Sequence, residues 1–467
     1  APVPALDNRV LWWPRGKVLG GSSSINAMCY VRGVAQDYDE WADAGATGWN
    51  WASVLPYFRR SEHNERGADA LHGANGPLYV SDLRYTNVLS HAFIEAGRQA
   101  GYPANRDFNG PDQEGFGLYQ VTQKNGERCS SAVAYLHPVR SRANLHVVTG
   151  AMVNRITFDR SGSVPRANGV TYTAGGKAFH QAANREVLLS GGAINSPQLL
   201  MLSGVGPATE LRRHGIDVLV DAPQVGGNLQ DHLDVCTLYH STQRVTYDRL
   251  SDLKVAFDYY LRGHSGAGSS NIAEAGAFIR SRHAPDARPD IQMHFVPAML
   301  DDHGRHRLAG DGFTVHACFL RPRSRGRLSL ASGRAGDKPR IEPNYLGDAE
   351  GFDLKMMIEC ARLSREVLAQ PAFDPYRGDP IYPARDDLDD AGLEAFVRAK
   401  AESVYHPIGT CRMGSDGASV VDPALKVRGV DGLRVIDASV MLTLIGGNTN
   451  APTIMIAERA ADLIRAS

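Results

Sequence analysis

Runs of apolar residues along the chain indicate where strands and helices form. Short β-rich runs at residues 145–148, 153–158, 167–173 and 186–189 are separated by polar turns and predict a β-meander that returns to a strand. Residues 9–13 predict another short strand, and the spacing of large side chains at residues 38–62 predicts a helix.

Turn and helix-cap residues predict two places where a strand is followed by a helix. In residues 191–206, Ser196 suits a helix N-cap, Pro197 the first helical position and Gly204 the C-terminal stop. Residues 433–437 predict a buried strand, and Pro452 begins a closing helix on which Ile456, Ala460, Leu463 and Ile464 share one face. The chain is expected to end on regular structure.

The segment from about residue 235 to 401 contains a second group of strand patterns. The runs lie at residues 275–279, 291–296, 314–320 and 326–330. They predict an antiparallel sheet with flanking helices, which makes the fold α/β (α+β).

Composition narrows the class of protein. With 467 residues, 43% hydrophobic and 22% charged, the chain can build two or three cores. Its 50 Lys and Arg nearly balance 51 Asp and Glu, without a run of like charge, so no nucleic-acid partner is expected.

The cysteine spacing and the hydropathy of the chain indicate where in the cell the protein is expected. The six cysteines show no C-x-x-C or metal-ligand spacing, so free thiols in a reducing compartment and no metal are expected. No stretch of the chain is apolar and long enough for a membrane-spanning helix, and none resembles a signal peptide. We therefore expect a soluble, cytoplasmic protein. Peripheral contact with the inner face of a membrane is left open.

Four motifs could carry chemistry. Gly20-Gly21-Ser22 lies in a Gly/Ser loop that could approach a phosphate or be a plain turn, and Gly191-Gly192 precedes a helix N-terminus that could face a pyrophosphate or be a plain βα turn. His406 sits in a Pro/Gly-punctuated loop and could be catalytic or structural. Asn450 lies before the closing helix and could bind a ligand or cap the helix.

Together these motifs, in this order and at these distances, resemble the glucose–methanol–choline (GMC) oxidoreductase family over essentially the whole chain. Residues 225–232, Val-Gly-Gly-Asn-Leu-Gln-Asp-His, are another familiar stretch. Residues 13–28 and 448–453 are most similar to the choline dehydrogenase and alcohol dehydrogenase branch.

The resemblance implies FAD as cofactor, bound between a discontinuous FAD domain (residues 1–40, 145–235 and 405–467) and a substrate or cap domain (41–144 and 236–404). Some relatives attach FAD through a histidine where this chain has Ile25, so non-covalent FAD is expected. The residues expected to line it are Gly20, Gly21, Ser22, Asn26, Val153 (through its backbone), Asp437, Ala438, Thr449 and Pro452.

The implied reaction oxidises a primary alcohol, choline-like or aliphatic, by hydride transfer to flavin N5, with electrons passed to a quinone or another carrier. His406 would take the hydroxyl proton and Asn450 would orient the hydroxyl oxygen, with Asn448 the alternative if the register differs. Val404, His294 and Glu274 are weaker candidates for the substrate pocket, and Glu274 could face a cationic head group.

The family's G-x-G-x-x-G unit is absent from the chain, which begins Ala-Pro-Val-Pro. We expect a longer protein that extends upstream. The alternatives are an oxygen-using alcohol oxidase and a flavin-free binding or scaffold protein; a serine hydrolase is disfavoured because there is no G-x-S-x-G. The oligomeric state stays open.

Overall fold

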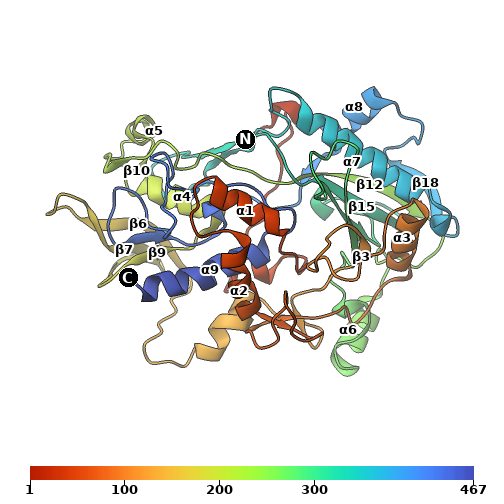
Figure 1. The fold of residues 1–467 in the computed structure, drawn as a ribbon, viewed down its shortest axis with the longest axis horizontal. Coiled ribbons are helices and arrows are strands. Elements are labelled where there is room, and N and C mark those ends of the chain that lie inside the picture. Colours follow the sequence, from red (N-terminus) through yellow and green to blue (C-terminus); the bar gives the residue numbers. More distant parts are fainter.

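The computed structural model describes residues 1–467 and contains two groups of elements, each with its own core (Figure 1). One end of the molecule holds a large sheet with helices beside it, and the other holds small sheets and α4. Helices α1 (Ala35–Asp43) and α2 (Trp51–Ser61) lie between these two ends in the view of Figure 1, and the closing helix α9 (Asn450–Arg465) runs from the C-terminus towards them.

The large sheet has seven strands and is antiparallel throughout, as predicted. Its order is β18 (Arg377–Tyr382), β12 (Leu233–Ser241), β15 (Gly312–Phe319), β14 (Ile291–Val296), β13 (Ala275–Ile279) and β3 (Gly115–Leu118), and β19 (Glu402–Ser403) also pairs with β12. Helices α3 (Val88–Gln99), α7 (Phe352–Leu368) and α8 (Asp390–Lys400) pack against it.

The register of the central strands brings several polar side chains together in the sheet. His294 pairs with His316 across β14 and β15, and Cys236 pairs with the same His316 across β12 and β15. Gly276 lies opposite His294 on the other neighbour, where a Cβ would collide with the ring of Tyr119. The absence of a side chain at Gly276 therefore makes room for Tyr119 next to His294.

The other end of the molecule is built from shorter elements. Strands β6 (Ala151–Asp159), β7 (Arg166–Ala174) and β8 (Lys177–Ala182) form an antiparallel sheet, while β9 (Val187–Leu189) pairs in parallel with β20 (Leu433–Val435). The helices here are α4 (Gly192–Leu202), α5 (Ala208–Arg213) and the closing helix α9 (Asn450–Arg465).

The remaining elements connect or flank these two ends. They are α1 (Ala35–Asp43), α2 (Trp51–Ser61), α6 (Asp252–Leu261), β1 (Glu62–Asn64) with β2 (Leu78–Val80), β4 (Gln123–Lys124) with β5 (Glu127–Arg128), β10 (Val205–Gly206) with β11 (Val220–Asp221), and β16 (Arg327–Ser329) with β17 (Arg340–Glu342).

Three expected elements differ from the structure. Residues 145–148 form no strand, because they have no partner and Val148 is exposed, and from residues 9–13 only Arg9 makes an isolated bridge. The predicted helix at residues 38–62 is two helices, α1 and α2. Gly45 (φ +101°) and Gly48 (φ +84°) adopt left-handed backbone between them, which ends a right-handed helix.

Helix α4 begins at Gly192, four residues before the predicted cap at Ser196. Pro197 therefore lies inside the helix, where its missing N–H deprives the Ala193 carbonyl of its usual donor. The hydroxyl of Thr410 donates to that carbonyl at 2.7 Å instead. The helix tolerates Pro197 because the segment after His406 supplies the lost hydrogen bond.

The two cores divide the chain differently from the predicted domains in several places. Val3 and Leu6 pack with the core of the large sheet, whereas Trp41 and Phe58 pack with the core that contains β9, β20 and α9. The predicted boundaries put each pair on the other side. The domain limits as a whole stay a prediction.

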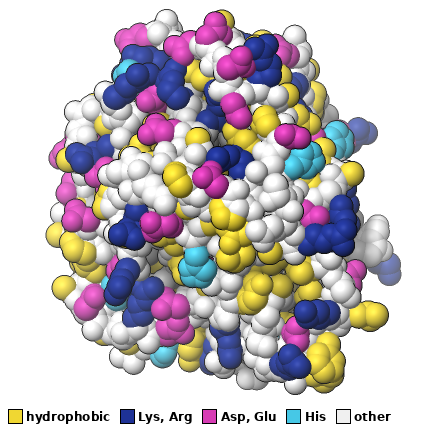
Figure 2. Space-filling model, turned by 90° about the vertical axis from the view of Figure 1, so that its right-hand side faces the viewer, with side chains coloured by type: hydrophobic (Ala, Val, Ile, Leu, Met, Phe, Trp, Pro, Cys, Tyr) yellow, Lys and Arg dark blue, Asp and Glu magenta, His cyan; other side chains and the backbone are white.

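The surface carries charges of both signs. Figure 2 shows lysine and arginine side chains intermixed with acidic ones on one face, without a field of a single sign. No helix is both long and apolar enough to cross a membrane. All six cysteines are free and buried.

Candidate active site

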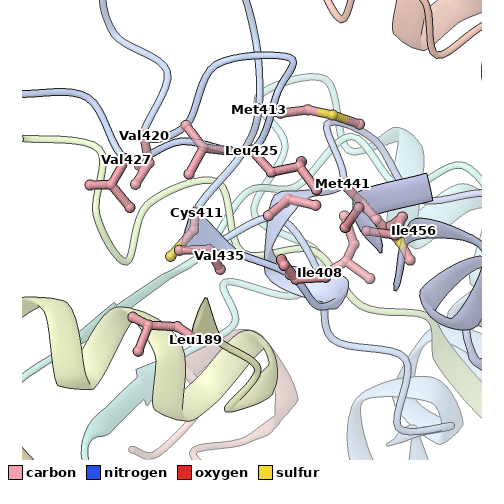
Figure 3. Close-up of a cluster of buried hydrophobic side chains, with 14 of the residues drawn as sticks. Leu189, Ile408, Cys411, Met413, Val420, Leu425, Val427, Val435, Met441 and Ile456 are labelled. Atoms are coloured by element: carbon pink, nitrogen blue, oxygen red, sulfur yellow. The ribbon is translucent and has the colours of Figure 1, made fainter. Parts of the chain in front are cut away.

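His406 lies in a loop that is fixed at both ends. The loop follows β19, and Tyr405 just before it has a left-handed backbone (φ +67°), which is uncommon for a residue with a side chain. After it, Ile408, Cys411 and Met413 point into a buried apolar cluster that includes Val435 and Ile456 (Figure 3). Packing of this kind positions His406 without the help of a regular element.

A buried carboxylate holds the backbone of the same loop. Asp231 accepts hydrogen bonds from the His406 N–H at 2.7 Å and from the hydroxyls of Tyr345 and Ser403. Burial raises the pKa of Asp231 to about 6, although these three donors act in the opposite direction. The three donors fix the turn that leads into His406.

The side chain of Asn448 contacts His406. Its amide nitrogen lies 3.2 Å from Nε2 of His406 and 3.4 Å from Nε2 of His294, and its oxygen accepts a hydrogen bond from Gln292 at 2.9 Å. His406 and His294 are both buried, with 7% and 8% of their surface exposed. Strand β14, which carries Gln292 and His294, thus meets the loop before α9 at His406.

Asn450, predicted to face His406, is the first residue of α9 and has no hydrogen bond with that histidine. Asn448, two residues earlier and the alternative in the sequence analysis, makes the contact with His406 instead. The reason is local: the chain passes from loop to helix between the two asparagines, so they do not present the same direction to His406.

Burial makes the histidines of this site neutral. It lowers the pKa of His294 to about 3, and it lowers the pKa of His406 well below the ordinary value, helped by the nearby His232 and His294. An imidazole that stays unprotonated at neutral pH can accept a proton, which a general base requires.

The residues expected to line FAD, and Gly192 of the second glycine motif, lie in different parts of the fold. Gly21 (φ +55°) and Gly192 (φ +76°) both have left-handed backbone, and a Cβ at either would meet no atom within 4 Å. Val153 lies on β6, the edge strand of its three-stranded sheet. Helix α9 begins after Thr449, which makes no side-chain capping bond, and Pro452 lies in its first turn.

These features fit an extended dinucleotide. Open backbone at two glycines allows close approach of an anion, and the uncapped N-terminus of α9 can stabilise negative charge. The serines of the first motif, however, already make hydrogen bonds within the protein. Ser22 accepts from the N–H of Gly16, and the hydroxyls of Ser23 and Ser24 donate to backbone carbonyls of their own loop.

The other expected flavin residues make bonds within the protein. Asp437 accepts from the N–H of Gly192 and the hydroxyl of Ser196, at the start of α4. The carbonyl of Ala438 accepts from the N–H of Gly409 at 3.3 Å. The side-chain oxygen of Asn26 accepts from Arg128.

The hydrogen bonds of Val404 and Glu274, two of the weaker candidates for the substrate pocket, show where each residue lies. The N–H of Val404, which is part of the loop that carries His406, donates to the carbonyl of His232 at 3.1 Å, so Val404 lies beside His232. Glu274 is fully buried and accepts from the hydroxyls of Tyr247, Ser270 and Ser90 and from the N–H of Asn87. With both oxygens taken by two donors each, it has little capacity left for a cationic ligand.

Sequence reasoning assigned no role to three residues that the structure brings to the site: Gln292, Asp231 and His232. Residues 225–232 resemble a family motif, but nothing in their spacing shows that they run beside residues 404–408. The available signal was the Asp231-His232 pair itself, because two adjacent ionisable side chains are costly to bury unless they are paired.

Comparison with known proteins identifies the class. Two models of the GMC oxidoreductase family match residues 2–234 and 322–457, and the chain belongs to this family. It is 47% identical to an alcohol dehydrogenase [acceptor] from Pseudomonas putida (99% of this chain, 84% of the relative) and 47% identical to the mitochondrial choline dehydrogenase of Mus musculus (99% and 78%). A solved pyridoxine 4-oxidase from Mesorbium loti superposes with a TM-score of 0.88 at 28% identity, covering all of this chain and 87% of that one.

Several predictions are thereby confirmed. The family, the mixed fold with an antiparallel sheet, FAD as the cofactor and FAD-dependent alcohol oxidation as the reaction class all agree with these relatives. An electron acceptor besides the flavin is required for turnover. Attachment of the flavin and the site residues stay predictions.

Proposed function

We propose that the protein oxidises a small primary alcohol, with His406 as the proton acceptor and Asn448 as the group that orients the substrate hydroxyl. The contact between Asn448 Nδ2 and His406 Nε2, 3.2 Å long, carries this assignment. A hydroxyl that replaces this contact can donate its proton to His406 and accept a hydrogen bond from the amide. Asn450 takes no part in this proposal.

FAD supplies the two-electron oxidant when it is bound. We propose that Gly20, Gly21 and Val153 contact it through backbone, and that the start of α9, at Thr449 and Pro452, lies against its electron-rich end. His406 removes the proton of the hydroxyl, and Asn448 keeps the hydroxyl oxygen in one orientation during that transfer.

We propose that the buried carboxylate of Asp234 favours a cationic or neutral substrate over an anionic one. Asp234 is buried on β12, two residues after His232, and its Oδ1 has no hydrogen-bond partner. Its neighbour Glu402 on β19 is also buried, and burial raises its pKa to about 7. We propose that choline-like alcohols bind with their ammonium towards Asp234, and that aliphatic alcohols bind more weakly.

The electron acceptor can be tested together with the substrate. The FAD-loaded protein is mixed anaerobically with choline, with 1-butanol and with a secondary alcohol, and flavin bleaching is followed. The reduced protein is then exposed to oxygen or to a soluble quinone. We expect primary alcohols to reduce the flavin and the quinone to reoxidise it faster. Rapid reoxidation by oxygen would instead identify an oxidase, and no bleaching by any alcohol would refute the proposal.

A further inference from the structure

A second histidine contacts His406 on the side away from Asn448. The Nδ1 atoms of His232 and His406 lie 2.9 Å apart, with their rings nearly perpendicular at 85°. His232 is completely buried. Two nitrogens at this distance share one hydrogen, so one ring donates and the other accepts.

The other nitrogen of His232 decides which ring is the donor. Its Nε2 lies 3.1 Å from the carbonyl oxygen of Leu320, which can only accept. The hydrogen of His232 must therefore be on Nε2. Burial lowers the pKa of His232 to about 3, so the ring is neutral and its Nδ1 keeps a lone pair.

The same assignment of donors and acceptors determines the state of Nε2 of His406, the atom proposed to accept the proton of the substrate. Since Nδ1 of His232 is an acceptor, Nδ1 of His406 carries the hydrogen, and Nε2 of His406 is left with its lone pair. The amide of Asn448, which can only donate through its nitrogen, lies on that Nε2 and agrees independently. The carbonyl of Leu320 thus determines the tautomer of His406 through one intermediate ring.

We propose that His232 is a positioning residue that holds His406 in the Nδ1–H tautomer, so that Nε2 is always free to accept the proton of the alcohol. This inference rests on the proposed role of His406 as the proton acceptor. A histidine without such a partner would distribute its hydrogen between both nitrogens, and the fraction with hydrogen on Nε2 could not act as a base there.

The backbone keeps the two rings in contact. The segment that contains His232 runs beside the loop of His406: the N–H of Val404 donates to the carbonyl of His232, and Gln230 and Ile408 exchange both of their backbone hydrogen bonds. The charged groups that act on the two rings are Arg321 and Asp37 for His232, and Arg15 for His406. No carboxylate hydrogen-bonds to either ring, so both stay neutral.

The tautomer can be measured in the FAD-loaded protein labelled with 15N-histidine. Long-range 1H–15N correlation spectra distinguish a protonated Nδ1 from a protonated Nε2, and the His406→Gln variant assigns the signals. We expect His406 with hydrogen on Nδ1 and His232 with hydrogen on Nε2, between pH 6 and 8. A His406 ring with hydrogen on Nε2 would overturn the inference and needs no activity measurement.

Two variants of His232 test the consequence for the reaction. His232→Gln keeps an acceptor oxygen and a donor nitrogen, whereas His232→Leu keeps neither. We expect His232→Leu to lower the limiting rate of flavin reduction by about 10²-fold, within the roughly 10²–10⁴-fold range of general-base catalysis, with little change in KM. His232→Gln should restore most of that rate, and flavin content and near-UV circular dichroism show whether each variant is folded.

Equal rates in the leucine and glutamine variants would overturn the inference. A third variant, His406→Ala, separates this outcome from a failure of the proposed function. If His406→Ala still reduces its flavin at the wild-type rate, His406 is not the base. If His406→Ala is slow while both His232 variants are unaffected, His406 is the base and His232 does not position it.

Discussion

The amide of Asn448 lies 3.2 Å from Nε2 of His406, and its oxygen is held at 2.9 Å by Gln292. Gln292 belongs to a central strand of the large sheet, whereas Asn448 precedes α9 in the other core. The hydrogen bond between them therefore ties the candidate base to both halves of the molecule. Displacement of either half would move Asn448 relative to His406.

The two asparagines before α9 should differ sharply when each is replaced by alanine. Asn448→Ala removes the amide that contacts His406, and we expect the limiting rate of flavin reduction to fall by roughly 10²-fold. Asn450→Ala removes no such contact, and its rate should stay within a few-fold of the wild type. Rapid-mixing measurements with one alcohol at saturation give both rates.

If Asn450→Ala were the slower of the two variants, Asn450 would be the residue that orients the substrate hydroxyl, as the sequence motif predicted. Asn448→His is an informative companion, because a histidine at that position can still donate to Nε2 of His406. It should be less impaired than Asn448→Ala.

His294 should make the protein less stable as the pH falls. Its pKa is about 3 in the folded protein, against about 6.5 in the unfolded chain, so below pH 6.5 only the unfolded state takes up its proton. Relative to His294→Gln, the wild type should lose about 1.4 kcal/mol of unfolding free energy per pH unit between pH 6 and 4. Above pH 7 the difference between the two proteins should be constant.

Urea unfolding of both proteins at several pH values measures this difference, and the comparison cancels other groups that titrate in the same range. Asp231 and Glu402 do so, because their folded pKa values are raised to about 6 and about 7. A difference that is independent of pH would mean that His294 takes up its proton in the folded protein as well.

The charge of Asp234 should matter only for a charged substrate. We expect Asp234→Asn to raise KM for choline by about 10-fold, equivalent to about 1.4 kcal/mol. KM for 3,3-dimethyl-1-butanol, the uncharged analogue of choline, should change much less. The neutral analogue is the control for any disturbance of His316, whose Nδ1 lies 2.7 Å from Asp234. Equal changes for both alcohols would exclude a direct role for Asp234 in recognising the ammonium.

Much of the fold could be predicted because the strands of the large sheet have clear apolar runs. Residues 275–279 and 291–296 coincide with β13 and β14. Residues 145–148 show the same pattern but form no strand, since a strand also needs a partner and none lies beside them. Pairing over long sequence distances, such as β3 with β13, is decided by tertiary packing that local patterns do not contain.

The candidate site was only partly predictable for the same reason. The order of the motifs predicted His406, and the family register assigned the second role to Asn450, with Asn448 as the alternative. The decisive contacts come from β14 and from residues 230–232, which are over 100 residues away from His406 in sequence. The sequence around His232 does not show that its ring contacts His406, and only the carbonyl of Leu320 shows which nitrogen carries the hydrogen of His232.

Finally, the hydrogen bond from Thr410 to the Ala193 carbonyl should stabilise the fold because of Pro197. In Thr410→Val this buried carbonyl has no donor, and we expect the free energy of unfolding to fall by about 1–3 kcal/mol. Thr410→Ser keeps the hydroxyl and should lose less. In a Pro197→Ala background the helix can supply its own N–H, so Thr410→Val should cost clearly less there. Urea unfolding of the four proteins of this cycle gives the coupling energy between Thr410 and Pro197, and a coupling of zero would show that the hydroxyl does not replace the missing N–H.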